Sequence, residues 1–334
     1  MKIALIGLPQ VGKKTVFSLL TGVSLDHLLG RAAEYHVGTV KVADPRVDKL
    51  SAMYNPKKTK YAEIEVTLAP APPQQTKSRE QWLEKLKAMD ALCHIVRVFD
   101  RDTDPQEDVN KIDLELAISD LSLIENRLNR ITQDQKKKFD QDRANEAELL
   151  ERLKPHLEAG KPLRDYPWHE GEEKKVRSLQ FLTLKPLVTA FNGGTGEVAG
   201  NLSCRLDAKT EAEVAEIEDP KERAEFLTAL GIAEPALHVL TRLLYKALGY
   251  ISFFTTGEDE VRAWTIRQGS TAVDAAHAIH SDLARGFIRA EVVHWADFAE
   301  HKDIKHCRDA GKFKLEGKGY IVQDGDMVVI RFAV

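Results

Sequence analysis

The sequence has few cysteines and no long apolar segment, and both scarcities exclude whole classes of protein. Its three cysteines, Cys93, Cys204 and Cys307, are far apart and lack the close spacing of zinc sites and redox motifs. No apolar run approaches the roughly 20 residues that cross a bilayer. Glycines and lysines interrupt the apolar start MKIALIGLPQVGKKT before a signal-peptide core forms. We therefore expect a cytoplasmic protein that is neither secreted nor embedded in a membrane.

A large excess of charge of either sign is also missing. The 48 basic and 52 acidic side chains leave a formal net charge of −4, which argues against a protein that coats nucleic acid through bulk charge. Any contact with RNA must therefore come from a local patch. With 334 residues and 43% hydrophobic content, the chain is long enough for two or three domains.

Apolar runs with β-strand character alternate with helix-like segments over the first half of the chain and again near residue 190. The β-like runs are Met1–Leu8, Val37–Ala43, Glu63–Ala69, Ala91–Phe99 and Leu184–Phe191. Strands that alternate with helices predict a parallel sheet covered by helices on both faces.

The segment from Ile112 to Leu157 has a different pattern, with leucines and isoleucines spaced by threes and fours among many charges. This spacing predicts a helical hairpin inserted into the α/β domain. The stretch Gln133–Lys138, which ends in three lysines, is its predicted tip. A lysine run of this kind is either a solvated helix end or a contact for nucleic acid.

From Gly249 onward the sequence predicts a small separate β-grasp domain. The runs ISFFTTG and VRAWTI alternate as strands do, and a helix-like run covers Ala272–Ala284. The chain ends in GYIVQDGDMVVIRFAV, where the turn Gln323–Asp326 between two β-rich runs predicts a hairpin.

The first β-like run leads directly into a glycine-rich stretch, Gly7-Leu8-Pro9-Gln10-Val11-Gly12-Lys13-Lys14, and then into a helix. Its spacing matches the phosphate-binding loop except at the last place. Backbone N–H groups and a helix N-terminus would face the phosphates, and Lys13 would reach the outer ones. The alternative is a tight turn whose glycines serve geometry alone. The predicted nucleotide-binding residues here are Gly7, Pro9, Gln10, Val11, Gly12, Lys13, Lys14 and Thr15.

Lys14 occupies the place where the motif has Ser or Thr, whose hydroxyl holds Mg²⁺. Thr15 cannot simply substitute, because one residue along a helix turns the side chain by about 100°. The Lys14 ammonium either neutralises phosphate where the metal belongs or points to solvent. We expect weakened binding of GTP or ATP in which Mg²⁺ has little part, and we predict no metal-ligand residues.

The stretch GLPQVGKKTVFSLLTG resembles the YchF/Obg-like family, whose loop reads G-L-P-N-V-G-K-S-T, and the resemblance covers nearly the whole chain. Further segments that resemble the family in the right order are VADPRVDKL, ALCHIVRVFDRD, LELAISDLSLIENRL, AEFLTALGI, VRAWTIRQGSTAVDAAHAIHSDLARGFIRAEVV and KLEGKGYIVQDGDMVVIRF. The resemblance implies an α/β fold with the parallel sheet of a P-loop NTPase, an inserted helical hairpin and a C-terminal β-grasp TGS domain. It also implies ATP or GTP binding, association with ribosomes, and a monomer. The corresponding boundaries are 1–108 with 180–248, 109–179 and 249–334.

Several motif positions of that family carry other residues here. The metal and γ-phosphate sensor D-x-x-G falls on Thr67-Leu68-Ala69-Pro70, and the glycine-rich loop that follows is replaced by APAPPQQTKSREQ. Without the aspartate the outer hold on Mg²⁺ is missing, and Pro70 has no N–H to offer a γ-phosphate. Thr39 is interpreted as an ordinary strand residue rather than a switch threonine.

The family's base-recognition motif, N-x-x-E, aligns with Asn192-Gly193-Gly194-Thr195, so the asparagine is kept and the acid is lost. Base selectivity should therefore be poor or altered. Asn192 is interpreted either as a base contact or as a turn residue. Ser203-Cys204-Arg205 resembles the family's S-A-K loop after the next strand, which makes Ser203 a further candidate for nucleotide binding.

The remaining candidates are scattered. His27, His36, His94 and His169 occur singly and are interpreted as satisfied structural or surface histidines, and a zinc site at His277 and His280 is disfavoured. In the TGS-like region a set of cations around one aromatic suits RNA, or else lines a solvated sheet edge. This set is Arg262, Trp264, Arg267, Arg285 and Arg289.

Taken together, the residues and the resemblance predict a nucleotide-binding, ribosome- or RNA-associated P-loop protein in which hydrolysis is weak or lost. No catalytic residue is predicted. Two alternatives stay open: a slow ATPase or GTPase with atypical use of metal, and a non-catalytic partner of an intact paralogue. The RNA or ribosome contact is expected through the helical hairpin and the TGS domain.

Overall fold

The computed structural model describes most of the chain in two compact units. The described residues are 1–31, 34–99, 104–194, 198, 200–230, 232, 234–301 and 304–333. One unit combines Met1–Gly38 with Glu65–Leu237, and the other combines Thr39–Ile64 with His238–Val334. The domain boundaries drawn from the sequence stay a prediction. In the structure, 39–64 groups with the C-terminal residues.

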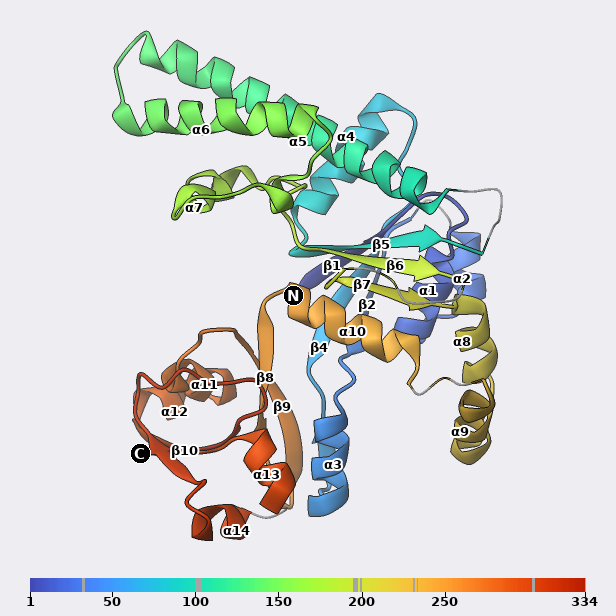
Figure 1. Ribbon diagram of the computed structural model, residues 1–334, viewed down its shortest axis with the longest axis vertical. Helices are drawn as coiled ribbons and strands as arrows, with labels where there is room; N and C mark the ends of the chain where they lie inside the picture. Colours follow the sequence, from blue (N-terminus) through green and yellow to red (C-terminus); the bar gives the residue numbers. More distant parts are fainter. Residues whose placement is uncertain are drawn as a thin grey trace. The chain divides into compact units, whose positions relative to one another are not determined.

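The N-terminal unit is built on a six-stranded sheet in the order β2-β4-β1-β5-β6-β7 (Figure 1). Its strands are β1 Lys2–Ile6, β2 His36–Lys41, β4 Glu63–Leu68, β5 Ala91–Arg97, β6 Leu187–Asn192 and β7 Ser203–Leu206. From β4 through β1, β5 and β6 to β7, neighbouring strands run parallel. The predicted parallel sheet is therefore confirmed. Strands β1 and β5 are almost wholly buried, as is typical of such sheets.

Helices cover this sheet and form its main core. They include α1 Lys13–Thr21, α2 Leu25–Gly30, α4 Thr76–Lys87 and α8 Ala208–Ala215. Helix α9, Pro220–Ala229, follows α8 and has no fully buried residue among those described. On one face, Trp82 and Leu86 of α4 pack against Ala4 and Ile6 of β1. This packing fixes the end of β1 and with it the loop that follows.

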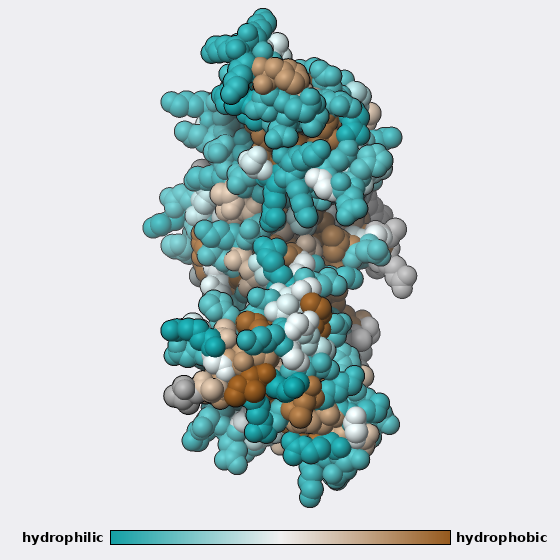
Figure 2. Space-filling model, turned by 90° about the vertical axis from the view of Figure 1, so that its left-hand side faces the viewer, coloured by the Kyte–Doolittle hydropathy of each residue, from teal (hydrophilic) through white to brown (hydrophobic). Residues whose placement is uncertain are grey.

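The inserted helical hairpin is confirmed. It consists of α5 Pro105–Gln135 and α6 Gln141–Glu158, followed by η1 Leu163–Asp165, α7 Glu172–Val176 and η2 Arg177–Leu179 (Figure 1). Asp104 and Asp140 cap the two helices by accepting backbone N–H groups. The lysines 136–138 lie between the helices, at the tip. The surface that Figure 2 shows over the hairpin is mostly hydrophilic, as expected where only the inner stripe is buried.

One buried carboxylate ties the hairpin to the sheet domain. Asp120 of α5 accepts hydrogen bonds from the backbone N–H of Leu182 (2.9 Å) and from the N–H (2.8 Å) and hydroxyl (2.7 Å) of Thr183, just before β6. Burial raises the pKa of this carboxyl, and the three donors oppose that rise. A fully buried acid of this kind is stabilised only because its oxygens are satisfied.

The C-terminal unit has a second sheet in the order β11-β10-β12-β8-β9-β3. Its strands are β3 Lys58–Lys60, β8 Tyr250–Thr255, β9 Glu260–Arg267, β10 Phe287–Val293, β11 Lys314–Glu316 and β12 Met327–Phe332. The helices are α3 Pro45–Tyr54, α10 Ala236–Ala247, which belongs to this unit from His238 onward, α11 Ala272–Ile279, α12 Ser281–Arg285, α13 Trp295–His301 and α14 Ile304–Asp309. An antiparallel hairpin, β8 with β9, holds β12 parallel to β8, and α11 covers the core. This is the predicted β-grasp architecture.

Two sequence expectations in this unit are wrong. The run 272–284 is not one helix, because His280 leaves helical geometry and caps α12 through its ring nitrogen on the Asp282 N–H. The turn Gln323–Asp326 does not join a hairpin. The residues before it form only an isolated bridge, Thr271 with Ile321, while β12 pairs with β10 and β8.

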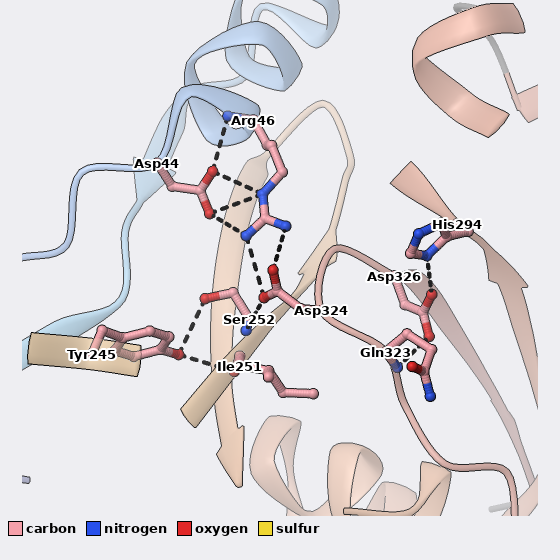
Figure 3. A network of polar contacts seen from close by, with 9 residues as sticks. All are labelled: Asp44, Arg46, Tyr245, Ile251, Ser252, His294, Gln323, Asp324 and Asp326. Carbon is pink, nitrogen blue, oxygen red and sulfur yellow. Dashed lines mark hydrogen bonds and ion pairs between the residues drawn. The ribbon is translucent and has the colours of Figure 1, made fainter. Parts of the chain in front are cut away.

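The two aspartates of that turn explain why it does not continue a strand. Asp324 pairs with Arg46 and accepts the Ser252 N–H (2.9 Å), as Figure 3 shows. Asp326 is fully buried and accepts hydrogen bonds from the Gln323 N–H (2.9 Å) and the Tyr320 hydroxyl (2.8 Å). The turn therefore serves as an anchor for the surrounding loops.

Candidate functional site

The loop between β1 and α1 has the backbone shape of an anion cradle. Gly7, Gln10 and Gly12 have φ values of 146°, 61° and 92°, and the two glycines adopt conformations that other residues rarely reach. At Gly12 a Cβ atom would lie 2.2 Å from the side-chain nitrogen of Asn192. A glycine is therefore required there by space as well as by conformation.

Lys13 lies inside this loop and is only 8% exposed. Its Nζ donates to the carbonyl oxygens of Gly7 (2.6 Å) and Leu8 (2.7 Å), which leaves one of its three donor hydrogens for a ligand. Burial, and next the charge of Lys14, lower its pKa to about 8. Burial of the Lys13 ammonium costs free energy of desolvation, and a bound anion would offset that cost by pairing with the charge.

The start of α1 concentrates positive charge. Gly12 caps the helix without a side-chain hydrogen bond, and the first turn has two lysines and no acid. Cations at a helix N-terminus are unfavourable, because that end of the helix dipole is itself positive. Lys13 and Lys14 therefore lie where an anion is favoured.

A cavity of about 460 Å³ opens beside the loop. One wall is the loop and helix start, from Pro9 to Thr15, and the facing wall is the apolar segment Leu68–Ala71. Leu25 and Leu29 of α2 close a third side. Glu34 is the one carboxylate among the described residues that line the cavity.

At the two motif positions, Lys14 and Thr67, the residues do not fit a Mg²⁺ ion, although Thr15 and Glu34 also line the cavity. A magnesium site beside a phosphate needs carboxylate or hydroxyl ligands at fixed places, and the described lining offers Lys14 and the segment Leu68–Ala71 where such ligands would stand. Thr67, aligned with the sensor aspartate, lines a different cavity together with Lys2 and Tyr35. Over the described part of the chain, no group of three or more metal-ligating side chains comes together.

Asn192 connects three segments beneath the cradle. Its Nδ2 donates to the Val11 carbonyl oxygen (3.0 Å), and its Oδ1 accepts the Ala208 N–H (2.9 Å) at the start of α8. The side chain is 5% exposed. It therefore positions the loop, whether or not it also contacts a base. Thr195, the position that lost the acid, lies outside the described residues.

The expected loop placement of Ser203-Cys204-Arg205 is wrong. These residues begin β7, where the Ser203 hydroxyl donates to the Gly200 carbonyl oxygen (2.9 Å) and Arg205 donates to that of Gly193 (2.7 Å). The residues that follow the strand are Asp207 and Ala208, and the Ala208 N–H is the one that meets Asn192. A nucleotide contact by Ser203 stays a prediction.

The interpretation of His94 as a satisfied or surface histidine is wrong. It is 1% exposed on β5, and neither ring nitrogen has a hydrogen-bond partner among the described residues. Burial first, then the charges of Lys13 and Arg164, lower its pKa to about 3. Its position between Cys93 and Ile95 in a continuous apolar strand was the signal that could have shown its burial.

In the C-terminal unit, the five residues of the predicted RNA patch lie on separate elements. Arg262, Trp264 and Arg267 belong to β9, whereas Arg285 ends α12 and Arg289 is on β10. Arg267 lies over the Tyr250 ring, and Arg285 pairs with Asp282. Arg262 and Trp264, however, line one cavity together.

Comparison with known proteins gives full-length relatives. The Bacillus subtilis (strain 168) protein named ribosome-binding ATPase YchF is 37% identical over 99% of this chain and 98% of its own length. The Oryza sativa subsp. japonica protein named Obg-like ATPase 1 is 30% identical over 100% of this chain and 92% of its own length. The Bacillus alignment spans 362 positions, more than the 334 residues here, so the relative has residues without a counterpart in this chain.

A solved structure is also similar to this chain over nearly its whole length. The solved structure titled the Schizosaccharomyces pombe YchF GTPase matches with a TM-score of 0.84 and 26% identity, over 99% of this chain and 97% of that one. The model of the YchF-GTPase_C family, described as a protein of unknown function (DUF933), matches residues 250–333. The chain belongs to the YchF/Obg-like ATPase family. No helix in the described ranges is both long and apolar enough to cross a membrane.

Proposed function

We propose that this chain is a ribosome- or RNA-associated protein that binds ATP or GTP through its phosphate loop with little help from Mg²⁺ and hydrolyses it weakly or not at all. The observation that carries the proposal is the contrast within one cavity. The loop wall offers backbone donors, Lys13 and Lys14, whereas the facing wall, Leu68–Ala71, offers no group that holds a metal.

Lys14 is proposed to supply the positive charge that Mg²⁺ supplies elsewhere. It lines the cavity from the first turn of α1, next to Lys13, which already lies in the loop. A lysine ammonium neutralises phosphate as a point charge but cannot arrange oxygens octahedrally as Mg²⁺ does. Binding by charge without metal geometry supports affinity better than it supports phosphoryl transfer.

The ribosome part of the proposal rests on two kinds of support. Several relatives are named ribosome-binding ATPases. In this chain, the lysines 136–138 lie at the tip of the hairpin and the exposed Phe139 follows them. A basic tip with an aromatic suits contact with RNA phosphates and bases.

A nucleotide titration tests the metal claim. ATP and GTP are titrated by calorimetry into the unmutated chain, Lys13→Ala and Lys14→Ser, each with Mg²⁺ and with a chelator. We expect the unmutated chain to bind equally in both conditions, Lys13→Ala to lose binding, and Lys14→Ser to gain a dependence on Mg²⁺. Affinity of the unmutated chain that rises steeply with Mg²⁺ would overturn the proposal.

Hydrolysis is tested separately by steady-state phosphate release, with Lys13→Ala as the background control. We expect release by the unmutated chain to stay close to that control, since a γ-phosphate sensor is missing at Pro70. Brisk release that requires Mg²⁺ would instead favour a slow, functional ATPase or GTPase. Co-sedimentation with ribosomes tests the proposed association with the ribosome.

A further inference from the structure

A second cavity, of about 600 Å³, lies where β3 pairs with β9. Its lining residues all fall in 39–64 or 238–334 and so belong to the C-terminal unit, including the ends of β2 and β4 that reach into these ranges. Its lining combines planar and cationic side chains, chiefly Lys41, Lys60, Tyr61, Arg262 and Trp264. Lys60 pairs in register with Arg262 across the two strands. Because a strand pairing fixes the backbone under these side chains, the cavity has a rigid floor.

Arg262 presents a flat cationic surface in this cavity. The central carbon of its guanidinium lies 3.6 Å from the centroid of the Trp264 ring, a close cation–π contact. Trp264 is itself held by the Phe253 ring, which is nearly parallel at 6.4 Å, and by a hydrogen bond from its Nε1 to the Thr255 hydroxyl (2.9 Å). One third of the Arg262 side chain (33%) is still exposed, so a planar ligand can reach it.

Tyr61 supplies a second planar group on the side of β3. Its hydroxyl donates to Asp48 of α3, which restricts the orientation of the ring. Burial and the neighbouring acids raise its pKa to about 12, with burial as the largest cause. Tyr61 therefore stays neutral and can stack at any physiological pH.

The charges of the cavity are nearly balanced. Glu260 pairs with Lys60 (3.0 Å) and lies 4.0 Å from Arg262, and Glu63 also lines the cavity. Lys41 forms no ion pair with any described residue. A site of this kind does not attract anions by bulk charge. It suits a ligand with one flat ring and one phosphate.

We propose that this cavity binds one unpaired nucleotide of single-stranded RNA, with the base stacked on the Arg262 guanidinium and a backbone phosphate contacted by Lys41. Proteins that bind unpaired RNA combine stacking on aromatic rings or arginine planes with nearby cations. RNA rather than a free nucleotide is chosen because the inference rests on the proposed ribosome association. To the proposed ribosome association, the inference adds the residues that would contact the RNA.

The chain contains a matched control on the same strand. Arg267 of β9 lies over the Tyr250 ring, with its guanidinium carbon 5.2 Å from the centroid, but neither residue lines the cavity. If arginines stacked on aromatics only stabilise this sheet, both positions should behave alike. If the cavity binds RNA, only Arg262 should matter.

The test measures binding of a fluorescently labelled six-nucleotide RNA by anisotropy. Full-length protein with Lys13→Ala is the background in every arm, so that the phosphate loop does not contribute. Arg262→Ala, Arg262→Lys and Arg267→Ala are added to it, with thermal unfolding as the check on folding. Inorganic polyphosphate, a DNA oligomer of the same sequence and an acidic peptide are the competitors.

We expect both Arg262 variants to weaken RNA binding about tenfold, because lysine keeps the charge but lacks the plane, and we expect Arg267→Ala to leave it unchanged. The DNA oligomer should compete about as well as RNA, because neither proposed contact involves the 2′-hydroxyl group. Binding by Arg262→Lys that equals the parent, competition by polyphosphate or the peptide as strong as by RNA, or no RNA binding at all would each overturn the proposal. Because nucleotide titrations read only the phosphate loop, failure here is distinguishable from failure of the metal claim.

Discussion

The two walls of the cavity beside α1 follow neighbouring strands and yet differ in almost every chemical respect. The loop wall follows β1 and the facing wall follows β4, and these strands are paired in register up to Leu5 and Leu68. One wall has backbone donors, Lys13 and Lys14. The other has Leu68, Ala69 and Pro70. The backbone therefore places both segments at the same edge of the sheet, and only the side chains separate their chemistry.

The difference shows which kind of recognition survives substitution. The proposed phosphate recognition by the loop would depend on backbone N–H groups and on the φ values of Gly7 and Gly12, and these persist when neighbouring side chains change. Metal recognition depends on particular oxygen atoms, which disappear with the side chains that carry them. Under the proposed function, a chain of this family keeps a loop that binds anions without the metal ligands and γ-phosphate sensor that a switch requires.

Of the substitutions considered in the loop wall, Gly12→Ala is expected to lower stability and nucleotide affinity the most. Its new Cβ would lie 2.2 Å from the Asn192 nitrogen at a φ of 92°, so the hydrogen bond from Asn192 to Val11 must also shift. We expect a loss of about 3 kcal/mol of unfolding free energy and a fall in nucleotide affinity of about a hundredfold. Urea unfolding and calorimetric titration measure the two effects.

Gly22→Ala is the matched control at the other end of α1. Gly22 has a φ of 73°, but nothing lies within 4 Å of a Cβ there. Conformational strain alone should cost about 1 kcal/mol and leave nucleotide affinity unchanged. Equal effects at both glycines would mean that the contact with Asn192 does not matter.

Burial and, second, the positive charge of Lys13 in the loop wall lower the pKa of His94. Its folded pKa of about 3 lies below the unfolded value of 6.5, so below pH 6.5 the unfolded chain binds a proton that the folded chain does not. Folded stability is therefore lost as the pH falls, by roughly 1.4 kcal/mol per unit. Between pH 7.5 and 5.0 we expect His94→Leu to lose about 2 kcal/mol less than the unmutated chain in urea unfolding. Parallel losses in the two proteins would show that His94 is not held neutral.

Much of the fold could be predicted from the sequence, because its strands and helices have clear local periodicity. The buried runs of β1 and β5 and the leucine spacing of α5 and α6 are examples. Expectations failed where distant contacts outweigh the local pattern. Asp324 and Asp326 bind Arg46, Ser252 and Tyr320 and so prevent a hairpin, and His280 interrupts a helix-like run by capping the next helix.

The candidate site could be predicted only in part for the same reason. The loop is one contiguous motif, and the sequence placed it correctly between β1 and α1. Asn192 meets Val11 across 181 positions, however, and no local spacing indicates that its amide supports the loop rather than facing solvent. The cavity between β3 and β9 likewise joins residues some 200 positions apart, so Lys41 and Tyr61 could not be foreseen as neighbours of Arg262.

Raising the pH removes the charge of Lys13 without a mutation and so tests the part of that charge in nucleotide binding. Its pKa of about 8 in the free protein should rise when a phosphate binds, so binding above pH 8 requires uptake of a proton. We expect the dissociation constant of the nucleotide to rise about tenfold between pH 8.5 and 9.5. Lys13→Gln, which cannot titrate, should bind weakly and independently of pH. A flat profile for the unmutated chain would exclude Lys13 as the charge that binds the anion.

The smallest effect is expected on the facing wall. In Pro70→Ala the backbone gains an N–H, while the carbonyl oxygen that accepts from Trp82 Nε1 (3.1 Å) is retained. If this wall plays no part in recognition, nucleotide affinity should change less than about threefold, or about 0.7 kcal/mol, with or without Mg²⁺. A tenfold gain that appears only with a nucleoside triphosphate, and not with a diphosphate, would mean that the wall still lies within reach of a γ-phosphate. The missing N–H of Pro70, rather than the missing carboxylate at Thr67, would then account for the proposed loss of γ-phosphate sensing.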